Sequence, residues 1–171
     1  MRILLLSTYD LGRQPFGLAS PAAWLRRASH HVTCQDLALD ALDEAAVCAA
    51  DLVAFYLPMH TATRLATRAV VRVRALNPRT RLGFYGLYAA MNEAHLRSLG
   101  AEFILSGEFE SGLLDQAARA ERSDAERPHA APPPVSLGRL EFTAPDRSGL
   151  PPLSRYARLR RDGDEHTVGY T

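Results

Sequence analysis

The chain contains 171 residues, of which 47% are hydrophobic. This length and composition suit one domain with a buried core, and the chain is too short for two large domains. Its 20 basic and 19 acidic residues leave a net charge of +1, so no long-range field favours nucleic acid or an anionic membrane as a partner. All 20 basic residues are arginines, which excludes mechanisms that need a lysine: phosphate-loop nucleotide binding, a Schiff base to pyridoxal phosphate, and phosphate-receiving regulator domains.

Short apolar runs alternate with longer segments of helical period, a pattern typical of parallel strands joined by crossover helices. Their apolar density indicates strands that are buried on both faces. We expect strands at Ile3 to Ser7, His31 to Asp36, Leu52 to Leu57, Arg81 to Tyr85 and Glu102 to Leu105. The sequence therefore predicts an α/β fold with a Rossmann-like (flavodoxin-like), doubly wound, five-stranded parallel sheet.

Helices are expected between these strands and after the last one. Ser20 followed by Pro21 predicts the cap and first turn of the first helix, which continues to Ala28. The clearest helical pattern is Thr61 to Leu76, where apolar residues recur at i, i+3 and i+4 until Asn77-Pro78 stops the helix. Further helices are expected at Asp40 to Ala49, Asn92 to Leu99 and Glu110 to Ala120.

The composition changes after residue 120. We expect residues 1–120 to form the compact domain and residues 121–171 to form a proline-rich linker, marked by Pro132-Pro133-Pro134, and an irregular C-terminal connector. Asp162-Gly163 indicates a hairpin turn within that connector. No signal peptide and no run of the ~18 apolar residues that span a bilayer is seen, so the expected compartment is the cytoplasm.

The two cysteines and the acidic pairs suggest little chemistry. Cys34 and Cys48 match neither a zinc pair nor a redox motif, and their apolar neighbours predict buried or half-buried thiols. Glu108 and Glu110 could act as acid and base, but the helix dipole explains two acids at a helix start equally well. No serine nucleophile elbow, metal-spaced histidine pair or clustered triad supports hydrolysis.

Open parallel sheets bind ligands at the carboxyl ends of their strands, near the point where the connections change direction. The loops after the first, third, fourth and fifth strands each carry a glycine or a helix cap there, which indicates a large, flat ligand. The candidate cofactor-binding residues are Tyr9, Asp10, Leu11, Gly12, Phe16, Gly17, Leu18, Leu57, Pro58, His60, Thr61, Gly86, Leu87, Tyr88, Ala89, Gly107, Glu108 and Glu110.

The order of several segments resembles the N-terminal cobalamin-binding domains of cobalamin-dependent radical SAM proteins. The resemblance covers nearly the whole chain. It is carried by Phe16-Gly17-Leu18 leading into Trp24-Leu25-Arg26-Arg27, by Val32 to Leu37, Asp51-Leu52-Val53, Gly86 to Ala89, Ser106-Gly107-Glu108-Phe109-Glu110, Gly149 to Ala157, and Val168-Gly169-Tyr170-Thr171.

The resemblance implies that cobalamin lies across the carboxyl edge of the sheet and faces a radical SAM barrel of the same parent chain. The four-iron cluster and S-adenosylmethionine would belong to that barrel, whose cluster-binding cysteines would come after this chain. The chain alone is therefore expected to bind the corrin without turnover.

Two positions depart from related patterns. Many cobalamin domains place Asp-x-His-x-x-Gly after the first strand, whereas Asp10 is followed here by Leu11 and Gly12, and Pro15 replaces the last glycine. The cobalt-ligating imidazole is thus absent, and Ser29 stands where a helix-ending glycine is expected. Two alternatives stay open: a flavin- or nucleotide-binding domain that uses the same loops, and a protein-interaction scaffold whose glycines only make turns.

Overall fold

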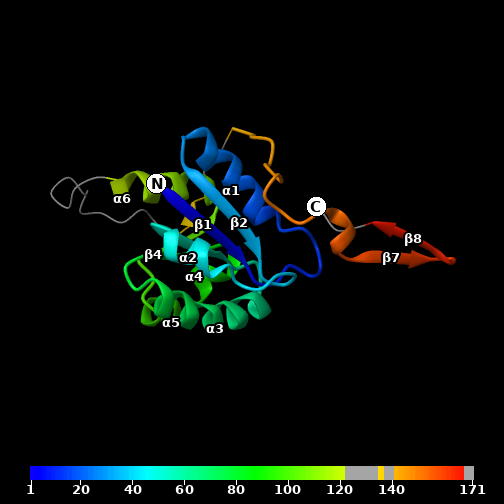
Figure 1. Cartoon of the computed structure of the whole chain (residues 1–171), viewed down its shortest axis with the longest axis horizontal. Coiled ribbons are helices and arrows are strands. Elements are labelled where there is room, and N and C mark those ends of the chain that lie inside the picture. The colour runs from blue at the N-terminus through cyan, green and yellow to red at the C-terminus, as the bar shows by residue number, and fades with distance from the viewer. Residues whose placement is uncertain (122–134, 137–140, 168–171) are drawn as a thin grey trace.

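The structure is a computed structural model that describes residues 1–121, 135–136 and 141–167. Its centre is a parallel sheet in the order β2-β1-β3-β4-β5, to whose edge β6 adds two residues. The strands are β1 (Arg2–Ser7), β2 (His31–Asp36), β3 (Leu52–Tyr56), β4 (Arg81–Tyr85), β5 (Phe103–Gly107) and β6 (Val135–Ser136). The predicted α/β fold with a doubly wound, five-stranded parallel sheet is confirmed (Figure 1).

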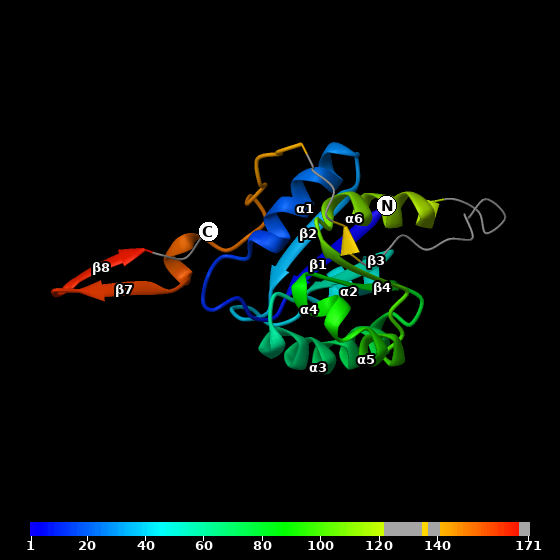
Figure 2. The same ribbon diagram turned by 180° about the vertical axis from the view of Figure 1, so that it is seen from behind.

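Helices cover both faces of the sheet, and successive side chains of each strand point to opposite faces. Leu4 and Leu6 of β1 pack with α3, whereas Ile3 and Leu5 pack with α1. One layer contains α1 (Phe16–Arg27) and α6 (Glu110–Glu121), and the other contains α2 (Glu44–Ala49), α3 (His60–Leu76), α4 (Leu87–Met91) and α5 (Glu93–Ser98) (Figures 1 and 2). The buried apolar runs of the sequence thus supply two cores at once.

The connections change direction at β1. The chain leaves β1 through α1 to reach β2 on one side, and it reaches β3 on the other side of β1 through α2 on the opposite face. This reversal places the switch point of the sheet between β1 and β3. A ligand site is therefore expected at the loops that follow β1 and β3.

Helix α1 begins at Phe16, four residues before the predicted cap at Ser20, and Pro21 lies inside it. Because proline has no N–H, it cannot bond the carbonyl of Gly17 one turn earlier. The hydroxyl of Tyr85 donates to that carbonyl instead, at 2.7 Å. The prediction of a helix start at Ser20 was wrong, because a long-range hydrogen bond makes the proline tolerable.

Three further details differ from the prediction. Helix α2 begins after Asp43, whose carboxylate accepts the N–H of Ala46, so the helix is shorter than expected. Helix α4 follows Gly86 where only a turn was expected. Cys34 is buried as predicted, whereas Cys48 is exposed.

The C-terminal segment returns to the domain. From residue 141 it runs along α1, where the N–H of Asp146 donates to the carbonyl of Ala19 at 2.9 Å and its carboxylate pairs with Arg26 at 2.5 Å. The N–H of Ala157 then donates to the carbonyl of Gly12 at 2.8 Å. The connector, drawn in orange, therefore covers α1 and joins the loop after β1 (Figures 1 and 2).

The predicted hairpin about Asp162-Gly163 is confirmed, and it projects away from the sheet (Figure 1). Both turn residues have positive φ, as a two-residue hairpin turn requires. The hairpin pairs β7 (Arg158–Arg161) with β8 (Asp164–Thr167), and a short 3-10 turn (Leu153–Arg155) precedes it. The predicted linker at Pro132-Pro133-Pro134 lies outside the described residues.

Candidate functional site at the carboxyl edge

The loops after β1, β3, β4 and β5 meet at the carboxyl edge, and backbone hydrogen bonds join three of them. The N–H of Leu57 donates to the carbonyl of Tyr85 at 2.7 Å, and Tyr88 donates to Leu57 at 3.0 Å. Gly86 donates to the carbonyl of Leu105 at 3.1 Å. The ends of β3, β4 and β5 therefore form one rigid edge.

Packing within the chain explains two of the predicted glycines, Gly86 and Gly17. Gly86 has φ of 107°, and a Cβ there would lie 2.9 Å from the carbonyl oxygen of Leu57. A Cβ on Gly17 would lie 2.3 Å from the ring of Tyr56. These two glycines are needed by the fold itself, so they do not by themselves indicate a ligand.

The loop after β1 exposes an apolar side chain in an unfavourable backbone conformation. The N–H of Arg13 donates to the carbonyl of Asp10 at 2.8 Å, which closes a turn whose central residues, Leu11 and Gly12, have φ of 51° and 74°. Leucine rarely adopts a positive φ, yet Leu11 does so while 56% exposed. Strain at an exposed apolar residue is typical of a segment whose shape serves binding.

A second exposed leucine lies on the neighbouring loop. Leu87, the first residue of α4, is 65% exposed and follows Gly86 at the end of β4. Met91 at the end of the same short helix is exposed as well. The carboxyl edge therefore presents apolar side chains to solvent on both sides of the switch point.

Two carboxylates lie behind the loop after β1. Burial raises the pKa of Asp10, the negative charge of Asp36 raises it further, and Arg13 opposes both effects. Burial also raises the pKa of Asp36, although the N–H of Ala38 donates to its carboxylate at 3.0 Å. Tyr156 of the connector lies beside Asp36. The pKa of the Tyr156 hydroxyl is raised, first by burial and second by the negative charge of Asp36. Sequence reasoning missed Asp36 and Tyr156, because only the fold brings them to Asp10.

An aromatic cluster fills the space under the edge. The ring centroids of Tyr56 and Tyr85 are 5.5 Å apart, and those of Tyr85 and Phe109 are 5.0 Å apart. Burial raises the pKa of Tyr56 to about 12, with smaller contributions from the charges of Asp10 and Glu110. The phenol is therefore neutral at physiological pH, and its ring packs within this cluster.

The structure sorts the predicted site residues into distinct groups. Leu18, Leu57 and Ala89 are fully buried, so they belong to the core and present no side chain to a ligand. The predicted residues that are exposed at this end of the sheet are Leu11, Gly12, Phe16, His60, Thr61, Leu87, Gly107 and Glu108. Those that lie half-buried among them are Tyr9, Asp10, Pro58 and Tyr88.

Three predicted residues line a separate pocket between α1, α6 and the connector. Phe16, Glu108 and Glu110 take part in this pocket, which has a volume of about 280 Å³. It also includes Ser20 and Trp24 of α1 and residues 141–143. Sequence reasoning missed the contribution of the connector, because no local pattern predicts its return to α1.

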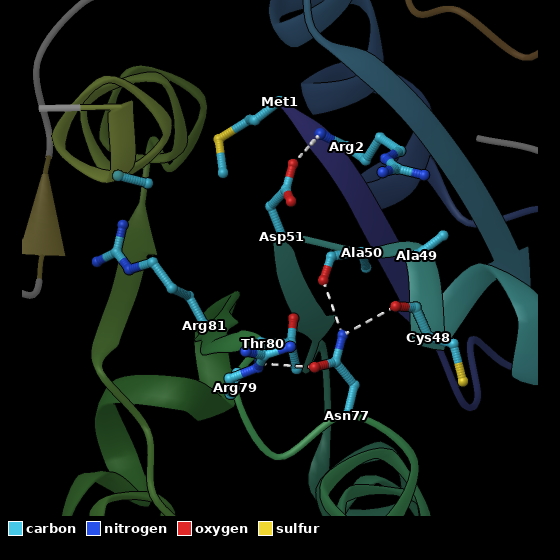
Figure 3. A pocket seen from close by; sticks show the side chains of 11 residues that line it. Met1, Arg2, Cys48, Ala49, Ala50, Asp51, Asn77, Arg79, Thr80 and Arg81 are labelled. Carbon is cyan, nitrogen blue, oxygen red and sulfur yellow. Dashed lines mark hydrogen bonds between the residues drawn. The ribbon is translucent and has the colours of Figure 1, made fainter.

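Another pocket lies at the opposite, amino edge of the sheet and has a volume of about 560 Å³ (Figure 3). The side-chain amide of Asn77 donates to the carbonyls of Ala50 and Cys48, and its oxygen accepts the N–H of Thr80. The N–H of Arg2 donates to Asp51 at 2.6 Å. As Figure 3 shows, the arginines that line this pocket spread apart, so they do not converge on one ligand atom.

The described residues hold no group of three or more His, Cys, Asp or Glu side chains placed to bind a metal ion. Within the same part of the chain, no helix is long and apolar enough to cross a membrane. No protein-family model matches the chain, and no curated protein matches it.

Proposed function

We propose that the chain is the cobalamin-binding module of a cytoplasmic radical SAM enzyme, with the corrin lying across the carboxyl edge of the sheet. The observation that carries the proposal is the exposure of Leu11 and Leu87 on two loops that flank the switch point. A corrin has a broad macrocycle with methyl groups on its faces and amide side chains around its rim, so exposed apolar side chains suit the macrocycle itself. The order of the motifs along the chain supports the same assignment.

The residues at this edge fit such a ligand. Leu11, Gly12, Leu87 and Tyr88 would contact the corrin, and His60 and Thr61 at the exposed start of α3 would face its polar substituents. The loop after β1 contains no histidine that could serve as a ligand to cobalt. When bound, cobalamin would supply methyl transfer or related radical chemistry together with a barrel and an iron–sulfur cluster outside this chain.

This chain's own residues prepare the edge. The hydrogen bonds from Gly86 and Tyr88 fix the loop after β4 before any ligand arrives, which lowers the entropy lost on binding. The bond from Ala157 to Gly12 ties the loop after β1 to the connector. A ligand would therefore meet a surface that is already ordered on both sides of the switch point.

The main alternative is a flavin or another nucleotide at the same edge. The fold supports it equally, because doubly wound sheets bind such ligands at the switch point. The exposed leucines favour the corrin over a nucleoside di- or triphosphate, since the sequence contains no lysine and no glycine-rich phosphate loop. A scaffold that binds only protein would also use exposed apolar side chains. The absorption spectrum of the retained ligand distinguishes the corrin, the flavin or nucleotide, and the scaffold that retains neither.

The test is a titration of the full chain with hydroxocobalamin, followed by desalting and visible absorption of the protein fraction. We expect a retained corrin spectrum without histidine-type ligation. Leu87→Glu should abolish retention, because it places a charge against the apolar macrocycle of the ligand. The matched control is Val71→Glu, which changes a residue of similar exposure, 68% against 65%, in the interior of α3.

A colourless protein under both reducing and oxidising conditions would refute the proposal, as would equal retention by the two variants. Parallel titrations with flavin mononucleotide and adenosine triphosphate identify the nucleotide alternative. A chain that retains none of the three ligands favours the scaffold.

A further inference from the structure

The pocket beside α1 combines acidic and aromatic side chains in a small volume of about 280 Å³. Its walls come from three segments: the first three turns of α1, the loop into α6 with the first residue of that helix, and the connector. The lining residues are Phe16, Ser20, Trp24, Glu108, Glu110, Glu141, Phe142 and Thr143.

Glu110 is the most buried of the acids, with only 6% of the residue exposed. One carboxylate oxygen, Oε1, accepts the hydroxyl of Ser20 at 2.6 Å. The other, Oε2, is buried and has no hydrogen-bond partner among the residues that the structure describes. A buried carboxylate oxygen without a donor is costly, so this atom indicates a missing donor.

Among the described residues, the other two carboxylates of the pocket have no cationic partner either. Glu108 and Glu141 make no ion pair or hydrogen bond through their side chains in the described part of the chain. Elsewhere arginines pair with acids readily, as Arg26 does with Asp146 and Arg81 with Glu102. In the described ranges, three acids around one pocket are therefore not paired with an arginine, although the chain is rich in arginine.

The aromatic residues supply walls that suit an organic cation. Phe16 is 37% exposed, and Phe142 is 83% exposed although it lines the same pocket. With Trp24 they contribute three aromatic rings to the lining, and aromatic rings attract ammonium groups and also cover methylene chains. The three carboxylates are not placed to hold one metal ion, so their charges suit a ligand with separated positive groups.

We propose that this pocket binds an organic cation of the alkylammonium class, namely a linear diamine or polyamine. One ammonium group donates to Oε2 of Glu110, and a second lies near Glu108 or Glu141. The methylene chain between them packs on the aromatic walls. This assignment does not depend on whether the carboxyl edge binds a corrin.

The wall that carries Glu141 and Phe142 is held in place by polar contacts. Arg27 donates to the hydroxyl of Thr143 at 3.0 Å, and Asp146 binds the backbone of α1. Arg27 brings one positive charge close to this wall. The described lining residues themselves include three acidic side chains and no basic one.

Trp24 is the only tryptophan of the chain, so its fluorescence reports on this pocket directly. We expect a saturable change in its emission when the full chain is titrated with the diamine cadaverine. The neutral diol of the same length should produce no saturable change. Magnesium chloride at equal ionic strength should also produce none, because a bare divalent ion finds no clustered ligands here.

Two variants test the charges. Glu108→Gln and Glu141→Gln change exposed side chains, and each should weaken cadaverine binding by up to about fivefold, the upper end for an exposed ion pair. Glu110→Gln should weaken it more, because its carboxylate is buried and binds directly. The control is Asp115→Asn, which removes an exposed carboxylate from α6 outside the pocket.

A flat fluorescence titration of the parent chain would overturn the proposal. So would a response to the diol equal to the response to the diamine, or an equal affinity of the parent and the Glu108→Gln and Glu141→Gln variants. Retention of hydroxocobalamin is measured in a separate experiment. Failure of the chain to retain cobalamin therefore leaves the result of the cadaverine titration unchanged, and the reverse also holds.

Discussion

Replacement of Tyr85 by phenylalanine tests how α1 tolerates a proline in its interior. The hydroxyl of Tyr85 donates to the carbonyl of Gly17 at 2.7 Å, and both groups are buried. Pro21 offers no N–H to this carbonyl. Tyr85→Phe therefore leaves a buried acceptor without a donor while it changes the packed volume very little.

The expected loss follows from the unsatisfied carbonyl. A buried polar group that loses its partner costs about 1–3 kcal/mol, and we expect Tyr85→Phe to lower the free energy of unfolding by about 2 kcal/mol. In a Pro21→Ala background the N–H of residue 21 becomes available to the same carbonyl. There the loss should fall below about 1 kcal/mol, the net value of an ordinary hydrogen bond.

The assay is a double-mutant cycle by urea unfolding, followed by far-ultraviolet circular dichroism and by the fluorescence of Trp24. Agreement of the two probes supports a two-state analysis. The coupling between Tyr85→Phe and Pro21→Ala should exceed about 1 kcal/mol. An equal loss in both backgrounds would refute the argument, because the carbonyl of Gly17 would then not be the group that the tyrosine stabilises.

Three other predictions concern the backbone and pH. Ser29 has φ of 64°, so Ser29→Gly should raise the free energy of unfolding by about 1 kcal/mol in urea unfolding, and a loss would contradict this. Gly17→Ala places a Cβ 2.3 Å from the ring of Tyr56 and should cost about 1–3 kcal/mol; an unchanged urea midpoint would show that the ring moves freely. Hydrogen bonds from Ser148 and a neighbouring arginine hold the pKa of Asp146 at about 2, below its usual value. The ionised group therefore stabilises the fold above about pH 4, and this contribution is lost as the pH falls toward 2, so thermal midpoints of Asp146→Asn and the parent should converge only in acid.

The strands could be predicted from the sequence because their signal is local. Residues 3–6 form an unbroken apolar run, and such a run is stable only where both faces are covered. The long pattern of α3 was equally clear, since its apolar positions and Asn77-Pro78 define both the face and the end of the helix. These features set the fold class without any knowledge of distant contacts.

The start of α1 could not be predicted, because Ser20-Pro21 has the composition of a helix start. The carbonyl of Gly17 depends on a donor from β4, which is distant in sequence. Ser20 is likewise not a cap, because its hydroxyl binds Glu110 of α6. Local patterns fail here because long-range partners satisfy the groups that the pattern leaves free.

The candidate site was predicted only in outline. The edge and its four loops follow from strand order, but Leu18 and Ala89 turned out to be core residues, because the residues next to a loop turn back into helices. The pocket that contains Glu110 could not be predicted from the sequence, since one of its walls comes from residues 141–143. Such a wall depends on tertiary packing of the connector.

The unequal exposure of the two cysteines gives a means of orienting the molecule. Burial raises the pKa of the Cys34 thiol to about 12, so this group reacts poorly, whereas Cys48 is exposed at the amino edge. A maleimide linker should therefore attach at Cys48 alone and leave the loops of the carboxyl edge facing away from the support. The native sequence thus allows surface-based binding measurements in one defined orientation, without an added tag.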